Sequence, residues 1–593
     1  MGKELFDNIP SKVGDLLNDV KNGRIGLPDL QRPFVWKDNK VQQLLDSMLK
    51  GYPIGYIMLW ESPADFENKN QIGSNTKVYT EARDLVIDGQ QRLTALLAAL
   101  KGIKIKDSKY RERPIRISFN PLTREFAVWS QAYERDPEWI SAVSEVFAAH
   151  EEELNIVYFR LKYIQQVNES RKKKGLPLLT EEEKIDVEIN INALLNLSIY
   201  LLPTLRINSA ASEEDVADIF VRVNSGGQKL TEKNFIETLL AVYDNEIHAQ
   251  INDFCRQSRI PKDGTSYNKI LEVDPVHLIR ASVGIAFKRA RLRYAYMLMR
   301  GKDLQTGQYS AETRETNLQL FREALKMVVN LNNWHAFMNI VAQAGYLKGS
   351  MISSGNAVIF AYILYLLGKQ EYKISAAQLN PLMKRYIFMV TLTGYYTSSP
   401  ESVMESQLAD LRNAKTAHDF IDYLNNVIAS QFTDDYFQRN LINDLKTSST
   451  SSPIWFGYVA SLNVLNLPML FSTTPTSYYF TAGANGSKLA IDIHHIFPKK
   501  YLERLGFKND RDRNQIAKYT FLDYTTNIEI SDEAPSDYVP KFRSKMGEEN
   551  YKLACKQNAL PENFESLEYM DFLNKRRVLM AAMIYKAYQK LSE

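Results

Sequence analysis

The sequence predicts a helix-rich α+β protein with three parts, and three observations support this. Residues 1–245 alternate short apolar runs, which are typical of strands, with segments of helical periodicity, as expected of an α/β domain. Residues 246–446 have helical periodicity almost throughout, and residues 447–593 contain an adjacent pair of histidines in a strand-like run. A chain of 593 residues also exceeds the ~250–300 residues at which a single hydrophobic core stops growing, so several domains are expected.

The composition is that of an ordinary soluble protein, with 45% hydrophobic and 24% charged residues. A net charge of +3 neither requires nor excludes a nucleic-acid partner, because a binding surface can be local. Cys255 and Cys555 are too few and too far apart for a disulfide framework or a cysteine zinc site, which fits a reducing cytoplasm. The N-terminus lacks a signal peptide, and the most apolar run, residues 357–368, is too short to span a bilayer. We therefore expect a cytoplasmic protein without a membrane partner.

Residues 84–102 (DLVIDGQQRLTALLAALKG) are the stretch around which the first part is organised. A three-residue apolar run predicts a buried strand, Asp88-Gly89 predicts a turn, and leucines at helical spacing predict a helix that ends at Gly102. The first turn of this helix carries polar side chains, namely Gln90, Gln91, Arg92 and Thr94. A helix N-terminus with an added arginine favours an anion such as a phosphate. The alternative is a core helix whose polar first turn is merely solvated.

The other segments of the first part are predicted in chain order. A helix capped by Asp38 or Asn39 ends at Gly51, and strands follow at residues 56–60 and 115–119. Residues 168–184 are charge-rich and include the run RKKK, which predicts a solvated loop. A helix over residues 213–223 leads into Asn224-Ser225-Gly226-Gly227, which forms either a simple turn or a backbone nest for an anion. A further helix begins at Thr231.

The middle and last parts contain one basic cluster and one linker. Residues 288–296 (KRARLRYAY) are the densest basic and aromatic cluster; on one helix they would grip a phosphate backbone or form a solvated face. Residues 447–453 (TSSTSSP) predict a linker, and residues 454–471 predict a helix.

Residues 489–498 (LAIDIHHIFP) predict a strand that ends at Pro498. Side chains alternate across a strand, so Asp492 and His494 share one face and His495 takes the other. One imidazole could then bind a metal while its neighbour accepts a proton from water. A second strand is expected at residues 519–522, with Asn527 at the turn that follows. The alternative is a pair of surface or core histidines without a metal.

Four blocks of this sequence resemble GmrSD-like type IV, modification-dependent restriction proteins. Residues 492–498 (DIHHIFP), with IAKYTFL at 516–522 and TNI at 526–528, resemble the ββα-metal HNH nuclease domain at their C-terminus. The N-terminal half is similar to their N-terminal domain, which has a ParB/sulfiredoxin-like fold. The blocks that carry this similarity are LQRPFVW at 30–36, IDGQQRLT at 87–94 and FVRVNSGG at 220–227, in the family's order.

The resemblance implies a nucleotide-dependent anti-phage endonuclease. It implies that the DGQQR region binds and hydrolyses a nucleoside triphosphate with Mg²⁺, and that the HNH domain cuts DNA. It assigns His495 as the general base and His494 and Asn527 as metal ligands. Lys518 departs from the family, which usually has an asparagine there that braces the loop between the strands. Lysine cannot accept a hydrogen bond, so Asn514 or a backbone group would have to substitute, or the nuclease is weakened.

These observations lead to one hypothesis. Asp88, Gly89, Gln90, Gln91, Arg92 and Thr94 bind the triphosphate, and Asp88 and Arg92 also act in its hydrolysis. Gln31, Arg32 and the loop with Asn224, Gly226 and Gly227 close over it. His495 is catalytic in DNA cleavage, and Asp492, His494 and Asn527 hold a divalent metal, with Mg²⁺ expected and Mn²⁺ or Ni²⁺ as alternatives.

The expected partners are DNA, in particular modified phage DNA, and a nucleoside triphosphate, and the helical middle contacts DNA or a second copy in a homodimer. Two rival hypotheses remain. One is a nucleotide-regulated DNA-binding protein with a degenerate nuclease domain, and the other is a toxin-like nuclease that needs no nucleotide.

Overall fold

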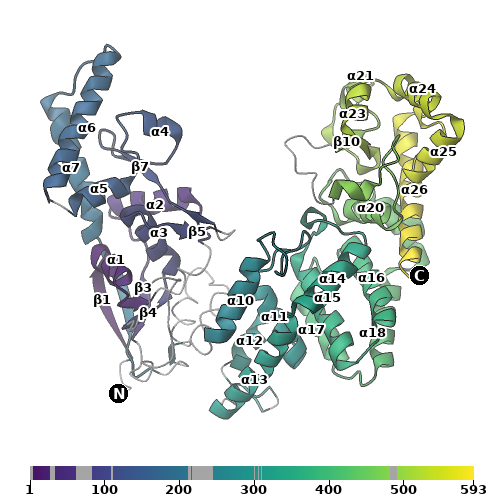
Figure 1. Ribbon diagram of the computed structural model, residues 1–593, viewed down its shortest axis with the longest axis horizontal. Helices are drawn as coiled ribbons and strands as arrows, with labels where there is room; N and C mark the ends of the chain where they lie inside the picture. The colour runs from purple at the N-terminus through teal and green to yellow at the C-terminus, as the bar shows by residue number, and fades with distance from the viewer. Residues whose placement is uncertain are drawn as a thin grey trace. The chain divides into compact units, whose positions relative to one another are not determined.

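The computed structural model (Figure 1) describes residues 5–26, 34–61, 83–107, 111–151, 153–211, 215–216, 219, 223, 245–299, 301–304, 306–308, 310–480 and 491–593. The chain divides into two compact units, Met1–His248 and Ala249–Glu593. The three domains predicted at residues 1–245, 246–446 and 447–593 stay a prediction.

The first unit contains a small mixed sheet of five strands in the order β1-β9-β3-β4-β2. These strands are β1 (Phe6–Lys12), β2 (Ile25–Gly26), β3 (Ile57–Glu61), β4 (Asp84–Asp88) and β9 (Leu201–Ile207). β4 pairs antiparallel with β3 and parallel with β2, and β3 pairs parallel with β9. Arg206 of β9 joins three strands, because its guanidinium pairs with Asp84 at 2.7 Å and Glu61 at 3.2 Å. The predicted strands at 56–60 and 85–87 are thus confirmed within one or two residues.

Helices pack on this sheet and form one hydrophobic core with it. They are α1 (Val13–Lys21), α2 (Asp38–Leu49), α3 (Gln90–Lys101), α5 (Val143–His150), α6 (Glu153–Lys173) and α7 (Glu181–Leu195), whereas the short α4 (Gln131–Arg135) buries no residue. The strands β5 (Ile105–Lys106), β6 (Glu112–Arg113), β7 (Ile117–Asn120) and β8 (Glu125–Val128) form two separate hairpins. α2 confirms the predicted helix, but Lys37 is its N-cap and Asp38 lies in its first turn, where it pairs with Arg113.

The prediction of a solvated loop at residues 168–184 is wrong. α6 continues to Lys173 and α7 begins at Glu181, so only seven residues separate the two helices. The charges that indicated a break stabilise the helices instead: Arg171 pairs with Glu138 and Glu183, and Thr180 and Glu183 form a capping box. α6 and α7 lie side by side as a helical hairpin (Figure 1).

The second unit begins as an array of helices, which confirms the helical middle part. They are α10 (Asn245–Gln257), α11 (Pro275–Phe287), α12 (Leu292–Met299), α13 (Ala311–Val328), α14 (Leu331–Gln343), α15 (Gly355–Leu366), α16 (Ala376–Thr393), α17 (Pro400–Leu411), α18 (Ala417–Gln431) and α19 (Leu441–Asp444). α15 is apolar all round and almost entirely buried, as expected of a central core helix.

The basic cluster at residues 288–296 does not lie on one helix. α11 ends at Phe287, Lys288 adopts a left-handed conformation (φ 50°), and α12 starts at Leu292. Acidic side chains pair with the cluster, Glu371 with Lys288 and Glu405 with Arg289. The cluster is therefore engaged within the unit, and it does not form a single basic helical face.

The remaining elements of the second unit surround a two-stranded sheet. They are α20 (Pro453–Val464), β10 (Ile491–His495), α21 (Lys499–Arg504), α22 (Asp510–Arg513), the 3₁₀ turn η8 (Ile516–Lys518), β11 (Tyr519–Asp523), α23 (Tyr524–Ile530), α24 (Pro535–Met546), α25 (Glu548–Gln557) and α26 (Tyr569–Lys590). α20 is shorter than the predicted helix at 454–471. None of the described helices combines the length and the apolar character needed to cross a membrane.

Candidate active site

The two histidines predicted to carry the chemistry lie on β10, which pairs antiparallel with β11. His494 lies opposite Thr520 and His495 opposite Tyr519. α23 follows β11 directly, and the Asp523 carboxylate caps it by accepting the Thr526 N–H at 2.8 Å. The predicted succession of strand, strand and helix is therefore present. Asn527, expected at a turn, lies within α23 instead.

His494 is almost fully buried and is oriented by Asn527, with 2.9 Å between its Nδ1 and the amide Oδ1. An amide oxygen only accepts hydrogen bonds, so Nδ1 carries the proton and Nε2 carries a lone pair. Nε2 is buried and has no hydrogen-bond partner among the described residues. Burial lowers the pKa of His494 to about 4, so the ring is neutral at neutral pH.

His495 is half-buried on the other face of the strand, with its ring centroid 4.8 Å from that of Tyr519. Burial, together with the nearby charges of Lys518 and Lys499, lowers the pKa of His495 to about 4. The imidazole is therefore neutral near pH 7 and able to accept a proton.

Lys518 is fully buried in η8, directly before β11. Its Nζ lies 5.7 Å from the centroid of the Tyr519 ring and has no hydrogen-bond partner in the described part of the chain. Burial lowers the pKa of its amine to about 8. The backbone carbonyl of Lys518, in contrast, accepts the Ile496 N–H at 3.0 Å. This backbone hydrogen bond joins the residue after β10 to the residue before β11, and the substitution of a backbone group for the family's asparagine stays a prediction.

A second brace comes from Arg576 on α26, a residue that the local sequence patterns do not single out. Its side chain is fully buried and donates to the carbonyls of Ala517 (3.0 Å), Tyr519 (2.8 Å) and Asn558 (3.4 Å). A signal for it exists in the sequence, because Arg576 takes a core position in the i, i+4 series of Phe572, Arg576, Met580 and Ile584. An arginine in an apolar helical series indicates a buried partner.

The fit of this site to a divalent metal rests on His494. Metal-binding histidines commonly donate one ring N–H to an oxygen and present the other nitrogen to the metal, as His494 does with Asn527. Oδ1 of Asn527, a predicted ligand, is occupied by this contact, and the side chain of Asp492 lies outside the described residues. Within the described residues, no three His, Cys, Asp or Glu side chains converge as a metal site.

The predicted nucleotide stretch forms the expected strand, turn and helix. Gly89 is the N-cap of α3 at φ 92°, and Gly102 is its C-cap at φ 68°. The Asp88 carboxylate accepts the Gly89 N–H at 2.8 Å, and the buried Gln90 donates to the Val86 carbonyl at 2.9 Å. The structure thus brings the DGQQR residues to the N-terminal end of a helix and fastens them to β4.

The side chains of this first turn differ in accessibility. Arg92 donates to the Tyr56 carbonyl at 2.6 Å, and burial lowers the pKa of its guanidinium. Oε1 of Gln91 accepts the Val35 N–H at 3.2 Å. Thr94 is buried in the core. The other predicted nucleotide residues lie outside the described residues, namely Gln31, Arg32, Asn224, Gly226 and Gly227.

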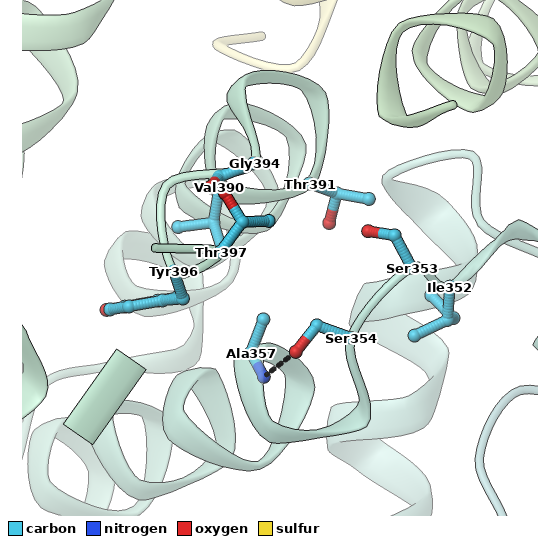
Figure 2. Close-up of a pocket in the computed structure, with 9 residues that line it drawn as sticks. All are labelled: Ile352, Ser353, Ser354, Ala357, Val390, Thr391, Gly394, Tyr396 and Thr397. Atoms are coloured by element: carbon cyan, nitrogen blue, oxygen red, sulfur yellow. Dashed lines mark hydrogen bonds between the residues drawn. The ribbon is translucent and has the colours of Figure 1, made fainter. Parts of the chain in front are cut away.

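A small pocket in the second unit lies between the start of α15 and the end of α16 (Figure 2). Its lining consists of Ile352, Ser353, Ser354, Ala357, Val390, Thr391, Gly394, Tyr396 and Thr397. Ser354 caps α15 by accepting the Ala357 N–H at 3.4 Å (Figure 2). The lining contains no histidine, carboxylate, amine, guanidinium or thiol, so it offers no group for acid–base chemistry near neutral pH.

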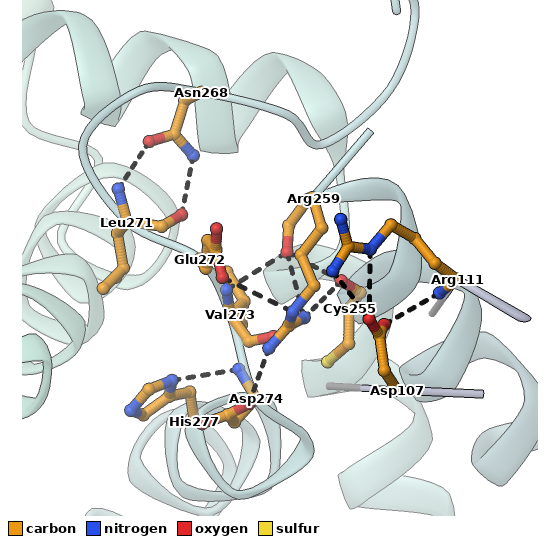
Figure 3. Close-up of polar contacts among 11 residues, drawn as sticks. Asp107, Arg111, Cys255, Arg259, Asn268, Leu271, Glu272, Val273, Asp274 and His277 are labelled. Carbon is orange, nitrogen blue, oxygen red and sulfur yellow. Dashed lines mark hydrogen bonds and ion pairs between the residues drawn. The ribbon is translucent and has the colours of Figure 1, made fainter. Parts of the chain in front are cut away.

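The polar cluster around Arg259 in the second unit has a structural role (Figure 3). Arg259 donates to the carbonyls of Cys255 (2.6 Å) and Val273 (2.7 Å) and pairs with Asp274 at 2.7 Å. Asp274 is the N-cap of α11, and His277 Nδ1 accepts its backbone N–H at 3.1 Å. These contacts connect the end of α10 to the start of α11.

Comparison with known proteins bears on the N-terminal part. Residues 13–241 match the family described as the GmrSD restriction endonuclease, N-terminal domain. The chain is also similar to an uncharacterized protein of Methanocaldococcus jannaschii, with 23% identity over 552 residues that cover 89% of this chain and 86% of that protein. The family match contains the Asp88–Thr94 turn and ends before the histidine pair. Residues 13–241 therefore support a GmrSD-like restriction protein N-terminus, which indicates a protein of the restriction endonuclease type with DNA as its substrate.

Proposed function

We propose that the chain is a nucleotide-dependent, modification-dependent DNA endonuclease of the type IV restriction kind, and that β10, β11 and α23 form an HNH nuclease site. The observation that carries this proposal is the different surroundings of two adjacent histidines. His494 presents a buried Nε2 without a partner among the described residues, oriented by Asn527, while the half-buried ring of His495 lies against Tyr519 on the opposite face. One strand thus offers a metal ligand and a base.

The chemistry assigns separate tasks to the residues of the site. His495 accepts the proton of the attacking water, and Tyr519 holds the imidazole by ring contact. His494, with its ring oriented by Asn527 and with Asp492 as a further predicted ligand, would hold a divalent cation (Mg²⁺, or Mn²⁺ or Ni²⁺), which when bound supplies positive charge to the phosphodiester and its leaving oxygen. Arg576 and the Lys518 carbonyl keep the loop before β11 in place.

The Asp88–Thr94 turn is the proposed nucleotide switch. Its support is the GmrSD-type N-terminal match together with the left-handed Gly89, which places the N-terminal end of α3, with its positive dipole end, at the end of β4. Arg92 would exchange the Tyr56 carbonyl for a phosphate oxygen, with Asp88 beside it. Gln90 and Thr94, which are buried, support the turn from behind. Gln31, Arg32 and residues 224–227 would close the site.

Cleavage of matched modified and unmodified phage DNA by the full chain tests this proposal. Each DNA is incubated with Mg²⁺, Mn²⁺ or Ni²⁺, with and without each nucleoside triphosphate. The proposal expects strand cleavage of the modified DNA that depends on both a metal and a triphosphate. Cleavage of unmodified DNA without a triphosphate would support a toxin-like nuclease instead.

A second function has support from one specific observation, the buried Lys518 in place of the family's asparagine. A positive charge close to His494 and His495 disfavours both a bound cation and a protonated base. A degenerate nuclease domain in a nucleotide-regulated DNA-binding protein would follow. DNA binding without cleavage under all three metals would favour this function.

A further inference from the structure

The helical hairpin of α6 and α7 exposes a second apolar face in addition to the one it buries. Val157, Tyr158 and Leu161 of α6 and Ile185 and Ile189 of α7 are each exposed by 54 to 67%. We call these five residues the α6–α7 apolar face. A hairpin that packs only against its own domain would carry polar side chains at these positions.

The five side chains lie on one side of the hairpin. We compare the directions of the side chains around each helix axis, viewed from the N-terminus of that helix. Around α6, the buried Ile156 is followed by Arg160, which faces α7, and then by Leu161. Around α7, the order in the same sense is the buried Val187, then Glu188 facing α6. Ile185 and Ile189 come next. The two helices are antiparallel. The same order around each axis therefore places the exposed apolar side chains of both helices on the same side of the hairpin, away from the core.

We propose that the α6–α7 apolar face packs against the same face of a second copy of this chain and forms a two-fold symmetric four-helix interface. This inference is independent of the proposed nuclease function. A symmetric interface needs a self-complementary surface, and an apolar face can meet itself. The charges of the two helices then determine how the second copy is oriented on this face.

The two helices carry opposite charges. α6 has five basic and two acidic residues, a net charge of +3, and α7 has five acidic residues and one basic residue, a net charge of −4. A two-fold axis parallel to the helices places α6 of one copy over α7 of the other, so that unlike charges meet. An axis across the helices would place α6 on α6 and α7 on α7, and like charges would repel.

The register within the hairpin specifies which charges meet. Arg171 pairs with Glu183 at 3.0 Å, and Arg160 donates to the side-chain oxygen of Asn192 at 2.6 Å, so residues 171 and 183 lie at one height and residues 160 and 192 at another. With the axis parallel to the helices, Lys172 meets Glu182 of the second copy. Both of these side chains are exposed and beside the apolar face.

Sedimentation equilibrium of the full chain tests this interface. We expect a dimer for the wild-type chain, and a dissociation constant that rises by at least about 100-fold in the double variant Leu161→Glu, Ile189→Glu. Leu320→Glu on α13, which also changes an exposed leucine, is the control and should leave the dimer intact. Circular dichroism verifies that each variant is folded.

A charge exchange tests the orientation. Lys172→Glu and Glu182→Lys should each weaken the dimer by about 3- to 10-fold at low salt, because each puts like charges together. The variant with both changes should return to within about 2-fold of wild type. A wild-type chain that stays monomeric, or a dimer that survives Leu161→Glu, Ile189→Glu, would overturn the interface. Single reversals without rescue by the double would overturn the two-fold arrangement.

Discussion

Arg576 donates a 2.8 Å hydrogen bond to the backbone carbonyl of Tyr519, the residue whose ring lies against His495. A helix near the end of the chain thereby holds the strand that faces the proposed base. The guanidinium is fully buried, and its described partners are neutral oxygens. It therefore supports the backbone as a fork of donors, which a lysine or a methionine cannot replace.

Replacing Arg576 with methionine should lower the free energy of unfolding by about 3 kcal/mol, because three buried carbonyls lose their charged donor. The neighbouring Arg577→Met is the matched control, since Arg577 donates to the side-chain amides of Asn574 and Gln515 and should cost only about 1 kcal/mol. Denaturant unfolding of both variants measures the difference. If the two variants lose the same unfolding free energy, Arg576 does not support the backbone in the way described.

Replacing Lys518 with methionine should stabilise the protein at pH 7 by about 1–3 kcal/mol, because a buried amine without a partner among the described residues is removed. The folded-state pKa of about 8 lies below the ordinary 10.5. As the pH rises from 8 toward 10.5, the folded amine loses its proton before the unfolded one, so the wild type gains stability. The advantage of the variant should therefore shrink over this interval in urea unfolding series. A constant advantage would show that Lys518 is not buried as a cation.

Replacing Gly89 with alanine should cost about 2–4 kcal/mol of unfolding free energy. Its φ of 92° disfavours any side chain, and a Cβ would collide with Cδ1 of Ile57. Gly51→Ala is the control, because Gly51 also has positive φ (73°) but nothing within 4 Å of an added Cβ, so only about 1 kcal/mol is expected. If thermal and denaturant unfolding show similar costs for the two variants, the close packing at the turn is not what requires glycine.

Replacing Arg92 with alanine should reduce triphosphate turnover by at least about 10-fold, because the proposed phosphate contact is lost. Hydrolysis is measured as phosphate release by the full chain, and His495→Ala serves as the control that should retain wild-type turnover. Unfolding curves separate this effect from the loss of the hydrogen bond to Tyr56. Unchanged hydrolysis in Arg92→Ala would remove the Asp88–Thr94 turn as the nucleotide site.

Local periodicity predicted the elements that carry the site. A short apolar run or a leucine series lies within each of β4, α3, β10 and β11. It failed where charge was the only signal. Residues 168–184 were predicted as a loop, although Arg171 and Glu183 pair across the α6–α7 hairpin. The basic cluster at 288–296 was placed on one helix, because the left-handed Lys288 leaves no mark in the local pattern.

Local sequence patterns also do not reveal the role of Arg576. Arg576 acts through carbonyls that lie 57 and 59 residues earlier in the chain, and only the folded packing of α26 against η8 and β11 brings them together. The sequence identified His494 and His495 as a pair. The assignment of Nδ1 and Nε2 of His494 required the observed contact with Asn527.

The cleavage rate of His495→Ala is the most direct test of the nuclease proposal. The initial rate on modified phage DNA, with a metal and a triphosphate that support wild-type cleavage, should fall by about 100-fold or more, while DNA binding is retained. His418→Ala, which removes an exposed histidine on α18, should cleave at the wild-type rate. A His495→Ala variant that cleaves as fast as the wild type would contradict the assignment of the nuclease site to β10.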